Sequence, residues 1–477
     1  MEGDSTDRQH QGLRVGLIDA LLYLLGLLGL VLGIQNVLGT GDLLSMASLL
    51  YFGAALSAVA IAVVGLRLQT RARLRLVLAL AGIGTALICA EWSLRLWSEY
   101  VANPQRVIAE RRGNEYDERR KREVVRDLRQ QGVEAVPTVS PATHLDSEGN
   151  PTISLAGSAP VLPLSGIGDR LTVFCNESGS YAVYRSDRYG YNNPAGVWNE
   201  ADATVAVLGD SFVHGACVDP GQNLVARIRT RWSQTLNLGY AGTGPLMQLA
   251  ILHEFLPAVE PEVVVWGYYE GNDLWNLESE ARSALLRSYL TRDRVQDLAA
   301  VHSKIDSILD SIVERRLRRT QRGPTSIISD LGLTLFRLRD YVGLTRSDLA
   351  GNSVAWRDTT GYRTSRANIP LFGRVLERAR ATVSSWGGKL LFLYLPSWDR
   401  FYGSMRRGDG GTRRQLLETV RRLGIPVIDV ASAFRSSDSV PRLFGQGELS
   451  YSHYSSKGYA VAGRKLSEKI RDVIEGR

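Results

Sequence analysis

About the first hundred residues of the chain are strongly apolar, and the remainder has the mixed pattern of a globular protein. Three apolar runs occur in this first part, at about residues 16–38, 43–66 and 74–97. Each is close to the ~20 residues that an α-helix needs to cross a bilayer. A cleaved signal peptide is the alternative for the first run, but its length and the two runs that follow directly argue against cleavage. The pattern therefore predicts a membrane domain with three transmembrane helices over residues 1–98.

Beyond the membrane domain, short apolar runs alternate with helical patterns. The runs are rich in β-branched and aromatic residues and are bounded by turn residues, which is typical of buried strands. They fall at about residues 204–208, 235–239, 262–268, 388–396 and 425–430. Strands that alternate with helices predict an α/β domain with a parallel, doubly wound sheet. We place this domain at residues 166–477.

Residues 99–165 are predicted to join the two domains. Residues 105–130 contain nine basic and six acidic side chains, a pattern typical of a solvated helix with ion pairs between successive turns. Residues 136–165 are rich in Pro, Ser and Gly and carry few helix signals, which predicts a linker.

A long insertion separates the third and fourth predicted strands, at about residues 274–387. Part of it has the pattern of an amphipathic helix, for example at residues 301–317. An insertion at this place rises over the C-terminal tips of the strands. It is either a lid or substrate wall, or a plain helical cover, and the sequence leaves both alternatives open.

The distribution of arginine predicts which side of the membrane each part occupies. The loop between the second and third apolar runs is rich in arginine, whereas the loop between the first and second contains no Lys or Arg; the basic residues are Arg67, Arg71, Arg73 and Arg75. The positive-inside rule then places the N-terminus in the cytoplasm and residues beyond the third helix on the opposite side. The formal net charge of +8 does not indicate a nucleic-acid partner in that compartment.

The first candidate for chemistry is Gly209-Asp210-Ser211, directly after a predicted strand. Ligands of open α/β sheets bind at the C-terminal ends of the strands, where Ser211 is expected to lie. Alone, the tripeptide is more often a turn in which Asp210 or Ser211 caps a helix. Three further blocks change that balance: Asn237 with Gly242 five residues later, Gly271-Asn272-Asp273 after the third strand, and His453 before a C-terminal helix.

These four blocks, in this order, resemble the SGNH (GDSL) hydrolases over roughly residues 166–477, and a bacterial branch in which the domain follows membrane helices. The resemblance implies a sheet with strand order 2-1-3-4-5, Ser211 as nucleophile and His453 as general base. It also implies an oxyanion hole formed by the N–H groups of Ser211 and Gly242 and the side-chain amide of Asn272. Asp210 and Asp273 are expected to hold loop backbones. His214 is a rival base on proximity alone, but it would have difficulty presenting a nitrogen to Ser211.

The chain departs from the family pattern at the third member of the triad. The family usually has Asp three residues before the histidine, where this chain has Ser450. Glu448 is the nearest carboxylate in sequence. Either Glu448 replaces the aspartate, or Ser211 and His453 act as a dyad, or catalysis is slow, since loss of the acid can reduce turnover by up to ~10⁴.

Two cysteines fall in the predicted outer domain, where oxidising conditions allow disulfides. Cys175 and Cys217 are either bonded to each other, which would tether the segment before the sheet beside Ser211, or two buried free thiols. No cysteine–histidine spacing indicates a zinc site, and we expect neither a metal nor a cofactor.

These features predict an extracytoplasmic serine esterase or O-acyltransferase, anchored in the bacterial inner membrane and working through an acyl-serine intermediate. The expected substrates are acyl esters, acetyl in particular, of cell-surface carbohydrate; the carbohydrate follows from the resemblance alone. A transferase would need a partner membrane protein to supply acyl groups. The alternative is a non-catalytic scaffold or binding protein in polysaccharide assembly, for which Ser450 is the best support.

Overall fold

The computed structural model divides the chain into two compact units, Met1–Ala102 with Gln321–Ala355, and Asn103–Thr320 with Trp356–Arg477. We call them the N-terminal unit and the main unit. The structure describes residues 19–20, 22–23, 27, 46–96, 104–111, 113, 115–155, 159–177, 179–199, 204–292, 296–319, 366–402, 410–447 and 452–476.

A five-stranded parallel sheet forms the centre of the main unit. Its strands are β6 (Val205–Gly209), β7 (Thr235–Gly239), β8 (Val263–Tyr269), β9 (Lys389–Leu395) and β10 (Val427–Asp429). They lie in the order β10-β9-β8-β6-β7, and all four pairings are parallel. Numbered along the chain, this is the predicted order 2-1-3-4-5, so the predicted fold of this domain is confirmed.

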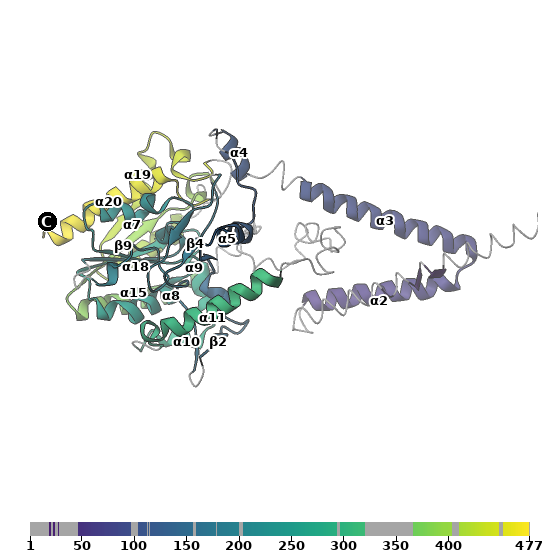
Figure 1. Ribbon diagram of the computed structural model, residues 1–477, viewed down its shortest axis with the longest axis horizontal. Coiled ribbons are helices and arrows are strands. Elements are labelled where there is room, and N and C mark those ends of the chain that lie inside the picture. The colour runs from purple at the N-terminus through teal and green to yellow at the C-terminus, as the bar shows by residue number, and fades with distance from the viewer. Residues whose placement is uncertain are drawn as a thin grey trace, which may run out of the picture. The chain divides into compact units, whose positions relative to one another are not determined.

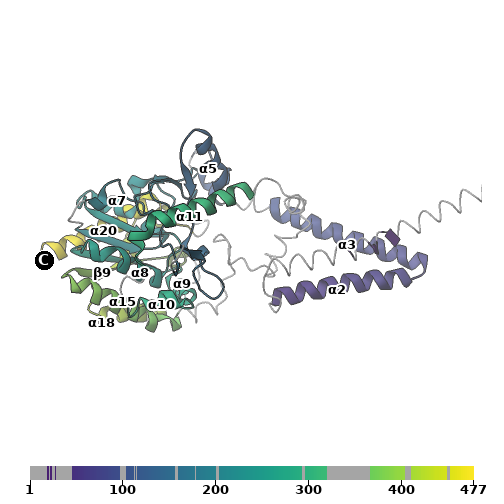
Figure 2. The same ribbon diagram turned by 60° about the horizontal axis from the view of Figure 1, so that its bottom comes forward.

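The strands read as continuous apolar runs because both faces of the sheet are buried. Leu208, Trp266 and Phe392 face a core that includes α8 (Pro245–Phe255) and α15 (Ile369–Ser385). The alternate residues face a second core with α7 (Leu224–Arg229) and α20 (Ser456–Ile474). Figures 1 and 2 show these two helix layers on opposite sides of the strands.

Further helices, most of them short, belong to the main unit. They are α4 (Pro104–Arg111), α5 (Lys121–Gln130), η2 (Pro141–His144), η3 (Val197–Asn199), α6 (Ser211–His214), η4 (Pro220–Gln222), η5 (Leu256–Ala258), α9 (Asp273–Glu280), α10 (Ala284–Ser288), α11 (Leu298–Arg319), α16 (Asp399–Tyr402), α18 (Gly410–Arg422), α19 (Val430–Arg435) and η7 (Val440–Leu443).

The segment that was predicted to be a linker is folded onto the main unit. β1 (Ala135–Pro137), β4 (Leu171–Val173) and β5 (Val183–Arg185) form a small sheet, and β2 (Ile153–Ser154) pairs with β3 (Pro160–Val161). Val136, Leu162 and Leu164 are buried in the same core as the large sheet. The composition that indicated a linker instead belongs to short strands and turns. We call residues 115–199 the cap segment.

Part of the helical insertion, α11, contacts the cap segment through hydrogen bonds. The backbone N–H of Gly168 donates to Asp306 of α11 at 3.2 Å, and Arg126 of α5 donates to the carbonyl of Leu317 at 2.8 Å. α15 packs on the large sheet and is therefore its ordinary crossover helix, not part of an insertion. Residues 320–365, the middle of the predicted insertion, lie outside the described residues.

In the N-terminal unit, the described helices are α2 (Met46–Arg67) and α3 (Thr70–Leu96). One helix in the described part, Thr70–Leu94, is long and apolar enough to cross a membrane by length and composition, and Leu56–Arg67 is a shorter apolar stretch. Most of the first predicted span, residues 16–38, lies outside the described residues. Among the residues that the structure describes there is thus one candidate span, where the sequence predicted three over residues 1–98.

The buried carboxylate of Glu254 ties α8 to the elements that follow the sheet tips, and its loss should destabilise the main unit. It accepts hydrogen bonds from the Tyr289 hydroxyl and from the N–H groups of Gln296 and Leu298. Replacing Glu254 with alanine leaves these donors unpaired and should lower the free energy of unfolding by about 2–4 kcal/mol. Urea unfolding of the full chain in detergent measures this, and Glu418→Ala on the exposed face of α18 is the matched control.

Candidate functional site

Ser211 lies directly beyond the C-terminal end of β6, as the first residue of α6. The Asp210 carboxylate caps this helix by accepting the N–H of Phe212 at 2.9 Å. A side chain at Gly209 would clash with Val213, and one at Gly239 would lie 2.5 Å from the backbone nitrogen of His214. The two glycines therefore let the turn that carries Ser211 pack tightly against the sheet.

His453 lies beside Ser211 although it follows it by 242 residues in the sequence. Its Nε2 lies 2.8 Å from the Ser211 hydroxyl oxygen. The loop that carries it is held by the hydrogen bond from the Gly445 N–H to the His453 carbonyl at 2.8 Å, and by the Tyr454 hydroxyl, which donates to the Pro396 carbonyl at 2.7 Å. The two residues that the sequence analysis paired are thus within hydrogen-bonding distance.

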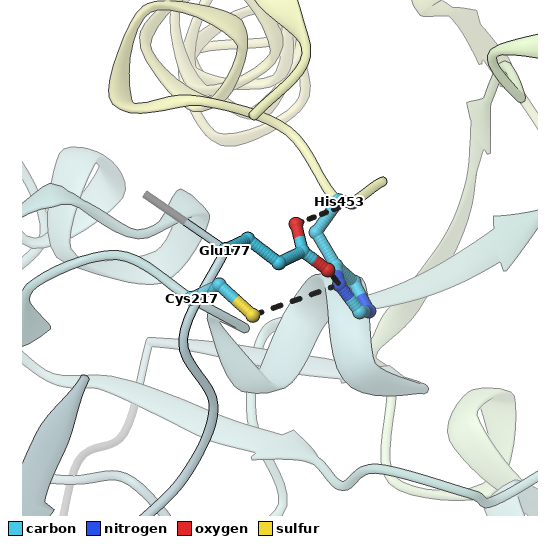
Figure 3. A group of neighbouring side chains, drawn as sticks. All are labelled: Glu177, Cys217 and His453. Atoms are coloured by element: carbon cyan, nitrogen blue, oxygen red, sulfur yellow. Dashed lines mark hydrogen bonds and ion pairs between the residues drawn. The ribbon is translucent and has the colours of Figure 1, made fainter. Parts of the chain in front are cut away.

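A third residue, Glu177, extends the hydrogen bonding from Ser211 and His453, and the sequence analysis did not identify it. Its Oε1 lies 2.7 Å from Nδ1 of His453, and its Oε2 accepts the backbone N–H of the same residue at 3.0 Å (Figure 3). One carboxylate thereby fixes both the ring and the backbone of the histidine. Glu448, the predicted third member, lies outside the described residues, as does Ser450.

A disulfide brings Glu177 to this position. Cys175 and Cys217 are bonded, with Cα atoms 5.1 Å apart, so that of the two alternatives in the sequence analysis the bonded one holds. Cys217 follows α6, and Glu177 is two residues beyond Cys175. The sequence therefore contained a signal: a bond between these cysteines places the residues around 175 within reach of those around 211.

The charges around His453 favour its cationic form. Burial lowers the pKa of its imidazole, but the adjacent Glu177 carboxylate and, to a smaller extent, Asp210 together outweigh burial, and the pKa lies above its usual value. Because Nδ1 faces a carboxylate, the neutral ring carries its proton there and presents the Nε2 lone pair to the Ser211 hydroxyl. This is the tautomer that a general base needs.

The two buried aspartates near Ser211 bind backbone, as expected. Burial raises the pKa of Asp210 to about 6, and the Phe212 N–H, the charge on His453 and the nearby Asn272 amide counteract it. Asp273 accepts the N–H of Tyr269 at 2.9 Å. Burial raises the pKa of Asp273 well above its usual value, and repulsion from Asp210 raises it further.

The three predicted oxyanion donors lie on adjoining loops. Ser211 is the first residue of α6, Asn272 begins α9, and Gly242 follows β7 with a φ of +83°. A side chain at Gly242 would clash with the Ser140 hydroxyl of the cap segment, so the position requires glycine for space as well as for its conformation. The amide of Asn272 lies near Asp210, the residue that precedes Ser211.

The loop after β7 is fixed from two sides. The buried Glu280 carboxylate accepts the N–H groups of Gly244 and Leu246 at the start of α8, at 2.5 and 2.8 Å. His214 accepts the N–H of Ala241 on its Nδ1 at 3.1 Å, and its Nε2 lies 2.7 Å from the Tyr184 hydroxyl of β5.

His214 is therefore a structural residue, not the base. Its ring stacks between Phe174 and Tyr240, with centroids 4.2 and 4.6 Å away. Both of its nitrogens are engaged, and burial lowers the pKa of its imidazole to about 3.

One group of potential metal ligands occurs in the described part of the chain: Glu177, Cys217 and His453, whose donor atoms all lie within 4.8 Å of one another. In the disulfide-bonded protein the sulfur of Cys217 is not a thiolate, and the other two members bond to each other. This form therefore offers no complete ligand set.

Comparison with known proteins gives only distant likenesses. No family model matches the chain, and no curated protein matches its sequence. Among solved structures, a lipase/acylhydrolase from Enterococcus faecalis is 14% identical, covers 56% of this chain and 94% of its own, and has a TM-score of 0.28. A protein from Desulfitobacterium hafniense DCB-2, described as lipolytic and of the G-D-S-L family, is 12% identical, covers 56% of this chain and 99% of its own, and has a TM-score of 0.28. Likenesses this weak carry no functional conclusion for this chain.

Replacing Glu177 with glutamine should lower the pKa of His453, because the carboxylate that stabilises the imidazolium is lost while burial, which acts in the opposite direction, remains. NMR titration of the protein with ¹⁵N-labelled histidine measures this pKa, with His453→Gln used to assign the signal. Glu448→Gln should leave the pKa unchanged. A drop in that variant instead would make Glu448 the partner of the histidine.

Proposed function

We propose that this chain is a serine esterase or O-acyltransferase of the SGNH (GDSL) type that works through an acyl-Ser211 intermediate. The observation that carries the proposal is the unbroken series of hydrogen bonds from the Ser211 hydroxyl to His453 at 2.8 Å and on to Glu177 at 2.7 Å. A hydroxyl, a base and an orienting acid in this arrangement are the parts that nucleophilic acyl transfer requires.

In the first half of the reaction, Ser211 attacks the acyl carbonyl while Nε2 of His453 takes the hydroxyl proton. The resulting oxyanion accepts hydrogen bonds from the N–H groups of Ser211 and Gly242 and from the Asn272 amide, each worth roughly 3 kcal/mol in the transition state. When the ester C–O bond breaks, the departing alcohol takes the proton from His453. Water or a sugar hydroxyl then attacks the acyl-serine by the same steps in reverse.

The non-catalytic scaffold is the weaker alternative. Its main support was the absence of an aspartate three residues before the histidine. Glu177 now occupies the place beside Nδ1, so an unusual residue at 450 no longer implies an incomplete triad.

We further propose that the N-terminal unit anchors the protein in the bacterial inner membrane, with the N-terminus in the cytoplasm and the main unit outside. Apolar side chains are exposed on its described helices, for example Leu56 at 56%, Leu78 at 62% and Ile83 at 58%, which fits contact with lipid. The disulfide of the main unit supports an oxidising compartment. Transferase activity in this setting requires a membrane partner that supplies acyl groups.

The substrate that fits best is a short acyl ester, such as acetyl, of a carbohydrate. Trp275 lies one helical turn beyond Asn272 and is 55% exposed; in the described part of the main unit it is the one exposed large apolar side chain. A lone exposed ring suits the apolar face of a sugar, whereas a long acyl chain would need a continuous apolar groove.

Three asparagines lie on or bind the helix that carries Trp275. Asn272 begins its helix, and Asn276 packs against Gly244 in the loop after β7. Asn368 donates to the carbonyl of Leu274 at 3.0 Å. Amide side chains offer both donors and acceptors to hydroxyl groups.

Ser211→Ala should abolish both labelling by a fluorophosphonate probe and hydrolysis of p-nitrophenyl acetate, because no other hydroxyl has His453 beside it in the described structure. We expect a loss of about 10³-fold or more in kcat/KM. Ser307→Ala on the exposed face of α11 should label and turn over like the unmodified protein. If the unmodified protein is well folded but is never labelled at Ser211, the non-catalytic scaffold is favoured instead.

Trp275→Ala should weaken the use of acetylated oligosaccharides without affecting small esters. Loss of a stacking contact of about 1.4 kcal/mol corresponds to a tenfold rise in KM for the oligosaccharide. The KM for p-nitrophenyl acetate should stay the same, and Trp275→Tyr should retain most of the oligosaccharide affinity. An equal effect on both substrates would show that the tryptophan supports the fold and not the sugar.

A further inference from the structure

Three chemically different donor atoms converge on the side of His453 that faces away from Ser211. Nδ1 of His453 lies 2.7 Å from a Glu177 oxygen and 3.8 Å from the sulfur of Cys217. Figure 3 shows the Glu177 and Cys217 side chains pointing toward this ring. All three donors lie within 4.8 Å of one another. A thiolate, an imidazole and a carboxylate are the common protein ligands of Zn²⁺, and three of them leave a fourth position for water.

Solvent reaches this cluster through a cavity behind the triad, which we call the side cavity. Its volume is about 140 Å³, and its lining includes Glu177, Cys217, Asp219, Gln222 and Ser455. A water molecule takes up about 30 Å³ in the liquid, so the side cavity holds several waters. A small reductant or a metal ion can therefore approach Cys217 without passing the Ser211 side of the ring.

We propose that reduction of the Cys175–Cys217 disulfide by a dithiol creates a zinc site formed by Cys217, His453 and Glu177. The dithiol supplies two electrons and two protons: the S–S bond breaks, both cysteines become thiols, and the reductant becomes a disulfide. Zn²⁺ then displaces the thiol proton of Cys217 to solvent and binds Nδ1 of the neutral His453 ring, whose proton moves from Nδ1 to Nε2 by exchange with water.

The three donor atoms lie within 4.8 Å of one another, so modest side-chain shifts bring them to the spacing that a metal needs. Tetrahedral zinc, with bonds of about 2.0–2.3 Å, places its ligand atoms about 3.3–3.6 Å apart. The nitrogen and oxygen must separate slightly from 2.7 Å, and the nitrogen and sulfur must approach slightly from 3.8 Å. Zinc would then replace the disulfide as the link between the Glu177 segment and the loop after α6.

Zinc bound to Nδ1 would prevent His453 from acting as a general base, even with its ring in the same position. A metal on Nδ1 leaves the proton of the neutral imidazole on Nε2, which then donates to the Ser211 oxygen and cannot accept its proton. The positive charge of the ion also opposes formation of the imidazolium. This consequence rests on the proposed function, whereas the metal site itself does not.

The test uses the full chain in detergent with Cys175→Ser, which leaves the Cys217 thiol free, and with the double variant Cys175→Ser/Cys217→Ser as matched control. Co²⁺ is the spectroscopic probe, and Zn²⁺ is added as competitor. The single variant should bind one Co²⁺, with thiolate-to-cobalt charge-transfer absorption and the d–d bands of tetrahedral cobalt. Zn²⁺ should remove these bands, and neither the double variant nor the oxidised wild type should develop them.

Hydrolysis of p-nitrophenyl acetate provides the second readout. Zn²⁺ should inhibit Cys175→Ser at concentrations at least tenfold below those that affect the double variant, and a chelator should restore the rate. Wild type that has been reduced with dithiothreitol and desalted gives the same measurements if Cys175→Ser does not fold.

The outcomes separate the two proposals. Absence of the cobalt spectrum in both folded thiol forms overturns the metal site. Cobalt binding with an unchanged rate of hydrolysis overturns the inhibition. Cobalt binding in a protein that hydrolyses no ester, even when oxidised and metal-free, supports the metal site and counts against the proposed enzymatic function.

Discussion

The two hydrogen bonds between the Glu177 carboxylate and His453 join a segment that precedes the sheet to a loop that follows it. They fix the tautomer of the ring, its approach to Ser211 and the path of the backbone around residue 453. The cap segment consequently contributes a residue to the site and is more than a cover of the main sheet. Its small sheet and its contacts with α11 hold the acid in place, as the main sheet holds the nucleophile.

The cap segment supports the opposite side of the site as well. Through Tyr184 it contacts His214, which in turn binds the loop that contains Gly242, and Ser140 fills the space above that glycine. The acid and the expected oxyanion donors thus depend on the same small piece of structure. The two histidines differ in charge environment: the Glu177 carboxylate raises the pKa of His453 against the effect of burial, whereas burial, with smaller contributions from the charges of Lys121 and His453, lowers the pKa of His214.

The large sheet could be predicted from sequence because its strands are buried on both faces and stand out as continuous apolar runs. Ser211, Gly242, Asn272 and His453 could be located because each follows a strand or precedes a helix within an ordered set of blocks. Glu177 could not, since it lies in a segment of very short strands with no periodicity and outside those blocks. Only the pairing of Cys175 with Cys217 pointed to it, and the sequence left that pairing open. The predicted linker failed for the same reason: turns and two-residue strands have the composition of loops.

The order of these residues along the chain has a consequence for biosynthesis. The ribosome produces Glu177 before Ser211, and His453 follows Glu177 by 276 residues. The hydroxyl at 211 has no base beside it until the last loop has been made and α20 has docked beside α7. On the proposed mechanism, a nascent chain therefore carries Ser211 without its base through nearly all of its translation, and the serine can become reactive only after residue 453 has been made and positioned.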